Sequence, residues 1–593
     1  MSKDTYQHLE ALRQVMASKN VDAVIIPGTD PHQSEYISDH WKFRDWLTGF
    51  NGSNGTAVVT ATEAGLWTDS RYFLQAQEQL EGSGFTLHKE HIPGEATIQE
   101  WLAQQLGDDS IVAIDGRLFS MVEANRLEVF CGNNGFMLAT DFYPADAIWP
   151  DRPARPSAPA FVHQEQWAGE SVDSKIERTL TEVKAAGADC MLVTALDDIA
   201  WLLNLRGSDI DFTPVVVSFC YISAHDRVLF IDEDKVTKEV KQHLKDCDVK
   251  IKDYDDITKY LTKVSEHRTI LLDPNAVSDT LGQSLLCQRL YAPSPIAELK
   301  ALKNEVEIAG ERAAMEHDGV AFTRMMMWLE QAVPAGGVTE IDVWNKLMEE
   351  RKKFSTYHED SFHMIVGYKE HGAIVHYEPT PESASTLAPE GLLLMDTGGQ
   401  YLEGTTDMTR TITLGNPTEQ EKHDFTLVLK GHLDLARAVF PVGTMGVQLD
   451  ALARMPLWQE GMTYLHGTGH GVGHFLCCHE GPQSIRMESN PTSLKLGMIT
   501  SNEPGLYKAG EYGIRTENLL LTVPATKNDD FGEFYKFETL TLFPYDVRLI
   551  DKSMLTREEI EQLNAYHQQV LDRLLPLLEP QEQEWLKSKA VQI

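Results

Sequence analysis

The chain has 593 residues, of which 42% are hydrophobic, and this length and composition are typical of a globular protein with two to four domains. Its 89 acidic and 52 basic residues give a net charge of −37, which argues against nucleic acid and anionic membrane as partners, because both require a basic face. No apolar run reaches the ~18 residues of a membrane span, and the first residues lack the apolar segment of a signal peptide.

The cysteines indicate a reducing compartment. There are seven, an odd number without a close-set pattern, which fits free thiols and a cytoplasmic protein. The adjacent Cys477 and Cys478 are expected to contribute to packing, because neighbouring side chains on an extended strand point to opposite faces.

Helices and strands alternate in the first part of the chain, which predicts an α/β domain. The expected helices cover 5–18 and 71–80, and the expected strands cover 21–27, 46–60, 64–69 and 110–116, with glycine turns between some of them.

The same pattern returns after a proline-rich segment, 143–161, that is typical of an interdomain linker. Residues 178–196 repeat the helix–strand order of the first domain, and 201–222 resemble 46–60, which indicates a divergent duplication. Neither copy contains a phosphate loop or a nucleophile elbow. A second boundary lies near 291–300, and two helices are expected to begin at Ala301 and Thr339. We therefore expect domains at 1–155, 156–298 and 299–549, with a helical extension at 550–593.

A glycine- and histidine-rich stretch, HGTGHGVGHFLCCHE, runs from His466 to Glu480. One interpretation is a zinc-binding helix, since His466, His470 and His474 are four positions apart. Glycine at every second position argues against it, because each costs a helix about 1 kcal/mol relative to alanine. The alternation favours an extended chain that another segment approaches closely, with these three histidines along one side.

Two pairs of carboxylates lie at the ends of predicted strands. Asp396 ends one strand and Asp407 lies on the next, while Glu503 ends a third and Glu517 lies on a fourth, on the same face as Arg515. The alternative for each pair is a strand-end carboxylate in solvent. Together with His470, however, four carboxylates balance two divalent cations, since like charges at this proximity do not all ionise without compensation. Oxygen-rich ligation with a single histidine favours Mn or Co over a structural zinc site.

These residues, with the stretches GAIVHYEP, MDTGGQYLEGTTDMTRT, HGTGHGVGHFLCCHEGP and NEPGLYKAGEYGIRTEN, resemble the metallopeptidase family with the pita-bread fold. Within that family the chain is similar to the three-domain Xaa-Pro aminopeptidases of group M24B, over nearly its whole length. The resemblance implies two creatinase-like α/β domains, then a pita-bread catalytic domain. It also implies peptide substrates with a penultimate proline and a homodimer formed through the amino-terminal domains or the carboxy-terminal segment.

The resemblance implies two divalent metal ions, most plausibly Mn²⁺, with Co²⁺ or Zn²⁺ as alternatives. Asp396 and Asp407 would hold one metal, Asp407 and Glu517 would bridge to the second, and His470 and Glu503 would complete the second. Glu503 would also be the general base toward a water that bridges the metals. The catalytic and substrate-binding histidines would be His376, His466 and His479, which bind the substrate carbonyl and stabilise the oxyanion, with Arg515 and Tyr507 near the substrate.

Three histidines depart from what the resemblance leads us to expect. His474 stands where a small residue such as serine is expected, and its role stays open. His363 and His371 are additional histidines near the site, for which surface positions are the favoured interpretation over tuning of metal affinity or pH response.

Three other functions compete with the aminopeptidase. A dipeptidase specific for Xaa-Pro would share the metal ligands but is expected to be shorter, whereas the duplicated first half favours the aminopeptidase. A non-catalytic pita-bread protein is expected to have lost metal ligands, and all five positions are present here. A creatine-type amidinohydrolase would lack the third domain and part of the histidine set.

Overall fold

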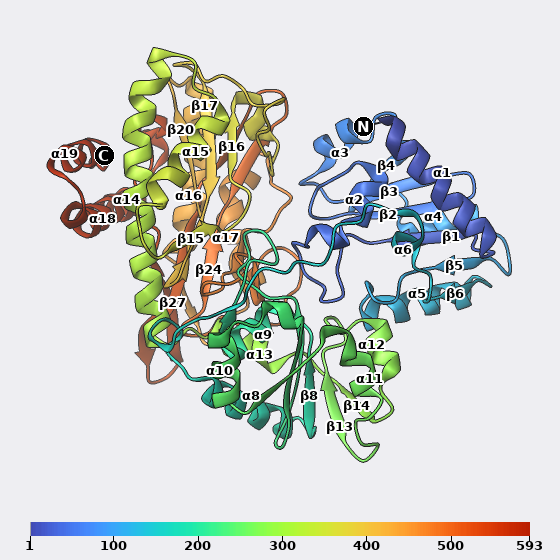
Figure 1. Ribbon diagram of the computed structural model, residues 1–593. Helices are drawn as coiled ribbons and strands as arrows, with labels where there is room; N and C mark the ends of the chain where they lie inside the picture. Colours follow the sequence, from blue (N-terminus) through green and yellow to red (C-terminus); the bar gives the residue numbers. More distant parts are fainter. Residues whose placement is uncertain (1) are drawn as a thin grey trace. The chain divides into compact units, whose positions relative to one another are not determined.

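The computed structural model describes the backbone of residues 2–593 and the side chains of residues 4–593 (Figure 1). The chain forms two compact units, which we describe separately. The amino-terminal unit comprises Met1–His163 and Glu170–Ala297, and the carboxy-terminal unit comprises Gln164–Gly169 and Glu298–Ile593. Among the described residues, no helix is both long enough and apolar enough to cross a membrane.

The amino-terminal unit contains the predicted duplication as two six-stranded sheets with equivalent strand orders. The first has the order β4 (Thr86–Lys89), β3 (Ala64–Thr68), β2 (Thr56–Thr60), β1 (Ala23–Ile26), β5 (Ile111–Ala113), β6 (Met137–Ala139). The second has the order β12 (Val249–Lys252), β11 (Arg227–Ile231), β10 (Ser218–Ser223), β8 (Cys190–Val193), β13 (Thr269–Leu272), β14 (Gln288–Tyr291). In both, the central strand pairs antiparallel on one side and parallel on the other.

The predicted strand 46–60 is wrong over its first half. Helix α2 covers Phe43–Thr48 and ends at Gly49, whose φ of 78° lies in the left-handed region that favours glycine, and only Thr56–Thr60 is a strand. The second copy has the same arrangement, because helix α9 (Leu196–Leu203) ends at a left-handed Asn204. A short apolar run bounded by glycine does not distinguish a helix end from a strand.

Two other predicted helix starts also moved. Helix α3 (Phe73–Gln79) begins two residues after the expected Arg71, because the Asp69 carboxylate accepts hydrogen bonds from the backbone and side chain of Arg71 and holds a turn. In the carboxy-terminal unit, the helix expected at Ala301 is two helices, α13 (Pro295–Ala301) and α14 (Glu305–Ala335). Asn304 caps the second with its side chain.

The carboxy-terminal unit places long helices against antiparallel sheets (Figure 1). Helix α14 runs along one side of it, and α18 (Arg557–Leu574) and α19 (Pro580–Lys589) contact that helix. The predicted helix at 339 is confirmed as α15 (Glu340–Arg351), which Thr339 caps. Helices α16 (Glu419–Ala436) and α17 (Gly446–Trp458) complete the helical layer, and the hydrophobic core includes Phe425, Val428 and Ile514.

Two strand pairs bring the predicted carboxylates to strand ends. Strands β17 (Leu392–Thr397) and β20 (Met408–Thr413) are antiparallel, with Asp396 opposite Thr409. Strands β24 (Ile499–Asn502) and β27 (Asn518–Asn528) are antiparallel, and their last pair is Asn502 with Asn518. Glu503 follows one of these two residues and Glu517 precedes the other, so both lie at the same end of the ladder.

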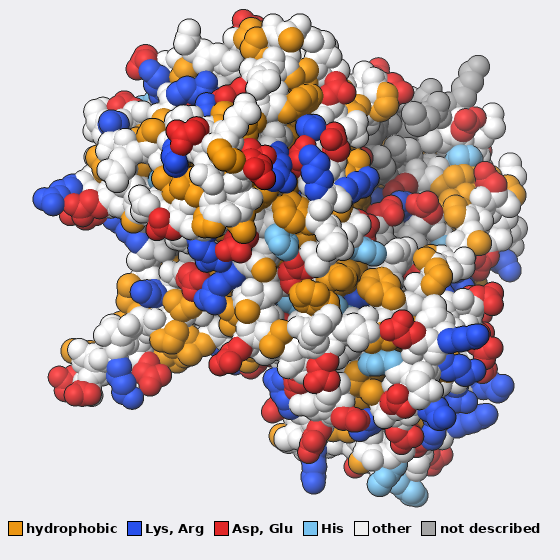
Figure 2. Space-filling view, turned by 60° about the vertical axis from the view of Figure 1, so that its left-hand side comes forward, with side chains coloured by type: hydrophobic (Ala, Val, Ile, Leu, Met, Phe, Trp, Pro, Cys, Tyr) orange, Lys and Arg blue, Asp and Glu red, His pale blue; other side chains and the backbone are white. Residues whose placement is uncertain are grey.

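The surface carries both acidic and basic side chains. On the face drawn in Figure 2, acidic, basic and apolar side chains are interspersed. The excess of acidic residues is therefore distributed as a solvated surface there.

Candidate metal centre

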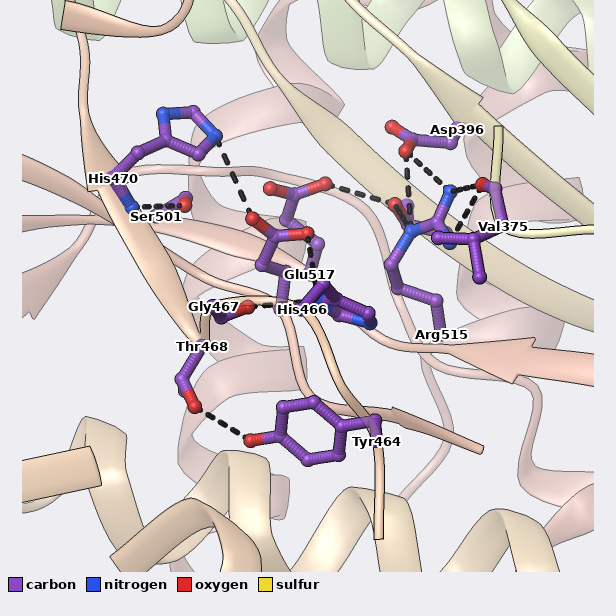
Figure 3. Close-up of polar contacts among 12 residues, drawn as sticks. Val375, Asp396, Tyr464, His466, Gly467, Thr468, His470, Ser501, Arg515 and Glu517 are labelled. Carbon is purple, nitrogen blue, oxygen red and sulfur yellow. Dashed lines mark hydrogen bonds and ion pairs between the residues drawn. The ribbon is translucent and has the colours of Figure 1, made fainter. Parts of the chain in front are cut away.

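Three of the predicted ligands converge within bonding reach of one ion. Asp407, His470 and Glu517 each offer a ligand atom, and these atoms all lie within 4.8 Å of one another. Asp407 directly precedes β20, His470 lies on β22 (Gly469–Gly471) and Glu517 directly precedes β27. Figure 3 shows the His470 ring directed at the neighbouring carboxylates.

His470 presents its Nε2 atom to the site. Its Nδ1–H donates to the carbonyl of Gly471 at 2.9 Å, which leaves Nε2 as the basic nitrogen of the neutral ring. That Nε2 lies 3.4 Å from Oδ2 of Asp407 and 3.6 Å from Oε1 of Glu503. Glu503, a further predicted metal ligand, therefore belongs to the same group of side chains.

Asp396 is held at one oxygen and left open at the other. Arg515 donates to its Oδ2 at 2.6 and 3.1 Å, as Figure 3 shows, while its Oδ1 is buried without a hydrogen-bond partner. Glu517 is oriented similarly, since Thr409 donates to its Oε2 at 2.8 Å. A buried carboxylate oxygen without a partner is costly unless a cation binds it, so the arrangement fits a metal ligand.

The electrostatics of the metal-free chain also favour a cation. Burial, reinforced by the neighbouring carboxylates, raises the pKa of Glu517 well above its usual value and that of Glu503 to about 7. Burial likewise raises the pKa of Asp396. With histidine neutral, the four carboxylates carry a charge of −4 when ionised, which two divalent cations balance.

Besides Arg515 and Asp396, the chain also pairs His470 with Asp407. Burial lowers the pKa of His470, but its contact with Asp407 and the charge of Glu503 raise it overall to about 9. Burial raises the pKa of Asp407, but hydrogen bonding by His470 and the nearby His479 bring it below its usual value. Without metal, protonated His470 therefore compensates part of the negative charge of these carboxylates.

The stretch 466–480 is extended at β22, as predicted, and turns after it, and the glycines of β22 allow close backbone approach. A Cβ atom on Gly469 would lie 1.9 Å from the carbonyl oxygen of Ser501, and one on Gly471 would lie 2.1 Å from that of Glu480. Any larger residue would push the neighbouring strands away from His470, which explains the alternating pattern.

The expectation that three histidines line one side holds for only two of them. His466 lies 4.0 Å from Glu503, and its Nε2 lies 2.9 Å from the hydroxyl of Tyr507. His474 instead is buried, and its Nε2 donates to the carbonyl of Trp167 at 3.1 Å. The parity argument fails because the chain leaves the strand after β22 and turns, with Phe475 at a φ of 49°.

The remaining predicted residues border this group. The ring of His479 lies 4.5 Å from that of His470, centroid to centroid. His376 is half-buried in a turn after the 3-10 helix η4 (Lys369–Ala373), and the carbonyl of its neighbour Val375 accepts hydrogen bonds from Arg515. Arg515 also donates to the Tyr507 hydroxyl at 2.7 Å, which joins the two residues expected near the substrate.

Of the two extra histidines, only one is a surface residue. His363 is 46% exposed and lies 3.0 Å from Glu378, so its surface assignment agrees with the structure. His371 corrects the expectation, because it is 20% exposed and contacts the fully buried Glu340 at 2.9 Å. It has a structural contact, which a pattern of isolated histidines did not reveal.

Sequence reasoning missed Cys478. Its thiol donates to Oδ2 of Asp407 at 3.3 Å, and the side chain is buried. Its place between the histidines of the predicted site was the available signal, but adjacent cysteines on a strand were interpreted as packing residues. Cys478 therefore helps to orient Asp407, a candidate metal ligand, through this hydrogen bond.

Comparison with known proteins places the whole chain in one family. The model of metallopeptidase family M24 matches residues 309–524, and that of the carboxy-terminal region of peptidase M24 matches 533–593. Two models described as creatinase/prolidase N-terminal domains match 8–142 and 151–307. The predicted fold, two creatinase-like α/β domains followed by a pita-bread metallopeptidase domain, is thereby confirmed.

Individual relatives agree with this result. Aminopeptidase P2 of Arabidopsis thaliana is 39% identical, over 98% of this chain and 87% of that protein. The crystal structure of an X-prolyl aminopeptidase from Caenorhabditis elegans, described as a cytosolic enzyme with a di-nuclear active site, is 33% identical with a TM-score of 0.96, over 99% of this chain and 100% of that one. An Xaa-Pro dipeptidase from Bacillus anthracis, 23% identical with a TM-score of 0.51, covers 63% of this chain and 99% of its own, and shares the fold.

Proposed function

Since this chain belongs to the Xaa-Pro aminopeptidase P members of metallopeptidase family M24, we propose that it is a dinuclear aminopeptidase that hydrolyses the bond between an N-terminal residue and a penultimate proline. The observation that carries the proposal is the convergence of four carboxylates and His470, with the buried Oδ1 of Asp396 open to a ligand. Its support is the full-length relationship to aminopeptidases of that name.

The proposed metal ligands are Asp396, Asp407, His470, Glu503 and Glu517. Two divalent cations, most plausibly Mn²⁺, would supply Lewis-acid activation of water and of the substrate carbonyl when bound. Arg515 orients Asp396 through its paired hydrogen bonds to Oδ2. Thr409 and Cys478 do the same for Glu517 and Asp407.

The proposed general base is Glu503. Its carboxylate is 19% exposed, which leaves it accessible to water and substrate while the other carboxylates are more deeply buried. It would accept a proton from the attacking water and donate it to the leaving prolyl nitrogen. That nitrogen belongs to a tertiary amide without an N–H, so it needs an external proton to depart as an amine.

His376, His466 and His479 are the proposed donors to the substrate carbonyl and to the oxyanion that develops on it. His466 is held in place by Tyr507 and by the carbonyl of Gly467, at 2.9 and 2.8 Å. The acidic site suits the free ammonium group of the substrate, and this preference would make the enzyme an exopeptidase.

Comparing Xaa-Pro-Yaa tripeptides with Xaa-Pro dipeptides tests the proposal. We expect the Mn-loaded protein to release the first residue of the tripeptide. Cleavage of the dipeptide alone would replace this proposal with the dipeptidase. If the protein binds two metals and peptides but turns over neither substrate, it is the non-catalytic alternative, and turnover of creatine would identify the amidinohydrolase.

Three further proposals concern the setting of the enzyme. We propose a cytoplasmic location, with the seven cysteines outside disulfide bonds in the described chain as support, and a homodimer that light scattering at several concentrations would test. The domain boundaries at 155/156, 298/299 and 549/550 stay predictions that limited proteolysis would test.

A further inference from the structure

A second concave site lies in the carboxy-terminal unit, and none of its lining residues belongs to the candidate metal centre. Its volume is about 520 Å³, within the range of small-molecule pockets. Its walls come from helix α7 (Glu165–Ala168), the first half of α14 and the turn before strand β19 (Gly404–Thr405). The residues used below are Trp167, Val306, Ala309, His317, Thr356 and Glu403.

Glu403 is a buried carboxylate with one open oxygen. It is 2% exposed, and Thr356 donates to its Oε1 at 2.7 Å while Nδ1 of His317 lies 2.9 Å from the same atom. Its Oε2 is buried and has no hydrogen-bond partner. A buried, half-satisfied carboxylate costs free energy that a cationic group in the pocket recovers.

A second carboxyl group stands behind the first. Glu311 is fully buried, and its Oε2 accepts a hydrogen bond from the backbone N–H of Thr405 at 3.2 Å. Its Oε1 has no partner, and burial, with the charge of Glu403 adding to it, raises the pKa of Glu311 to about 8. Glu311 is therefore a neutral acid near pH 7 and does not itself attract a cation, so the position left for a cationic group is Oε2 of Glu403.

The rest of the pocket is mostly apolar. Trp167 is half-buried, and Val306 and Ala309 are exposed on the same side of α14. Gly310 lets the helix approach the turn, since a Cβ atom there would lie 2.3 Å from the carbonyl oxygen of Glu403. An indole beside a carboxylate suits an organic cation, because both attract positive charge and the indole also covers apolar surface.

We propose that this pocket binds a small organic cation, a protonated primary amine carried on an apolar body. The ammonium group donates to Oε2 of Glu403, and the apolar body lies against Trp167 and Val306. The site is independent of peptide hydrolysis, although its walls connect to the metal centre: His474 holds the carbonyl of Trp167, and Glu403 precedes Asp407 by four positions.

Calorimetric titration of the metal-loaded full-length protein with 2-phenylethylammonium chloride tests the proposal. We expect saturable binding that falls about tenfold or more in Glu403→Gln, since a hydrogen bond to a charged group is worth about 1.5–3 kcal/mol. Ala309→Phe should fill the pocket from an exposed helix position and also abolish binding. Glu349→Gln, which neutralises an exposed carboxylate on α15, is the matched control and should bind normally.

The outcomes separate this site from the metal centre and from simple apolar binding. Equal affinity for 2-phenylethanol would show that no cation is recognised. Undiminished binding of the amine by both pocket variants, or its loss in Glu503→Ala alone, would overturn the proposal in favour of the metal centre. If Glu403→Gln does not fold, Ala309→Phe decides the question.

Discussion

Two groups of buried acidic residues in the carboxy-terminal unit are compensated in opposite ways. Around Arg351, which is fully buried, the chain itself supplies every partner. The guanidinium donates to both oxygens of Asp318 and to one of Asp360, and Trp344 donates to the other oxygen of Asp360 at 2.8 Å. The hydroxyl of Tyr401 adds a further bond to Asp318.

At the metal centre the balance is left incomplete. Four carboxylates share one guanidinium and one imidazole, and Oδ1 of Asp396 has no partner. Both groups are buried and both contain arginine–aspartate pairs, so burial and ion pairing alone do not mark a functional site. The difference that marks it is charge left uncompensated by the described chain.

The largest expected effect is that of Glu503→Ala on the activity of the metal centre. The variant should fold, because it removes a charge from a group with too many, yet kcat should fall about 10⁴-fold, the upper end for a general base. Hydrolysis of an Xaa-Pro-Yaa peptide with Mn²⁺ measures it. Glu511→Ala, at an exposed position near by, is the control, and a full rate in the first variant would remove Glu503 from the role of base.

Arg351→Met tests the compensated group. It leaves Asp318 and Asp360 buried without their guanidinium, and we expect a loss of about 3–5 kcal/mol in the free energy of unfolding. Urea denaturation measures the loss, while the metal content of the folded fraction should stay unchanged. Arg557→Met is the control, because its ion pair with Glu561 is exposed and worth little. Equal effects of the two changes would contradict the comparison.

Stability of the metal-free protein should depend on pH in the opposite sense from an ordinary ion pair. The pKa of Glu503 rises from 4.5 to about 7 on folding, so between these values the folded state binds more protons than the unfolded state. The stabilisation that protonated Glu503 contributes is therefore fully present below pH 4.5. It is lost as the pH rises to 7, which lowers the free energy of unfolding by on the order of 3 kcal/mol. Denaturation in chelator at several pH values measures this slope.

The matched variant for that experiment is Glu503→Gln, which cannot titrate at this position. It should have a flatter slope than the parent protein, and loading with Mn²⁺ should also flatten the parent's slope because cations replace the protons. An unchanged slope in both cases would show that the carboxylates of the metal centre do not interact as their burial indicates.

The smallest expected effect is that of Cys478→Val. The thiol is a weak donor to Asp407, so its loss should weaken metal binding about tenfold, the lower end for a residue that supports a ligand. Calorimetric titration with Mn²⁺ measures the affinity. Cys220→Val, which changes a fully buried thiol of the amino-terminal unit, should leave it unaltered, and equal affinities in the two variants would exclude the supporting role.

The residues of the metal centre could be predicted from the sequence, because they follow local patterns along the chain. Asp396, Glu503 and Glu517 stand next to predicted strands, and strand pairing brings them together. The alternating glycines indicated an extended backbone around His470, and the close approach of Ser501 and Glu480 gives the reason.

The group of charged residues around Arg351 could not be predicted from the sequence in this way. Asp318 lies on α14, Arg351 ends α15 and Asp360 ends strand β15 (Tyr357–Asp360), and no spacing along the chain signals their contact. The cation pocket is similar, because Trp167 comes from a segment well over a hundred positions before α14. Such contacts depend on tertiary packing, which also decided between helix and strand at Trp46.

The assignment of Gln164–Gly169 to the carboxy-terminal unit has a practical consequence for engineering. The chain passes between the two units three times. The first passage brings these six residues into the carboxy-terminal unit, and the second returns the chain to the amino-terminal unit at Glu170. A catalytic fragment truncated at Glu298 would expose His474 and delete one wall of the cation pocket. Chimeras that exchange amino-terminal halves between relatives should therefore transplant this hexapeptide along with the catalytic half.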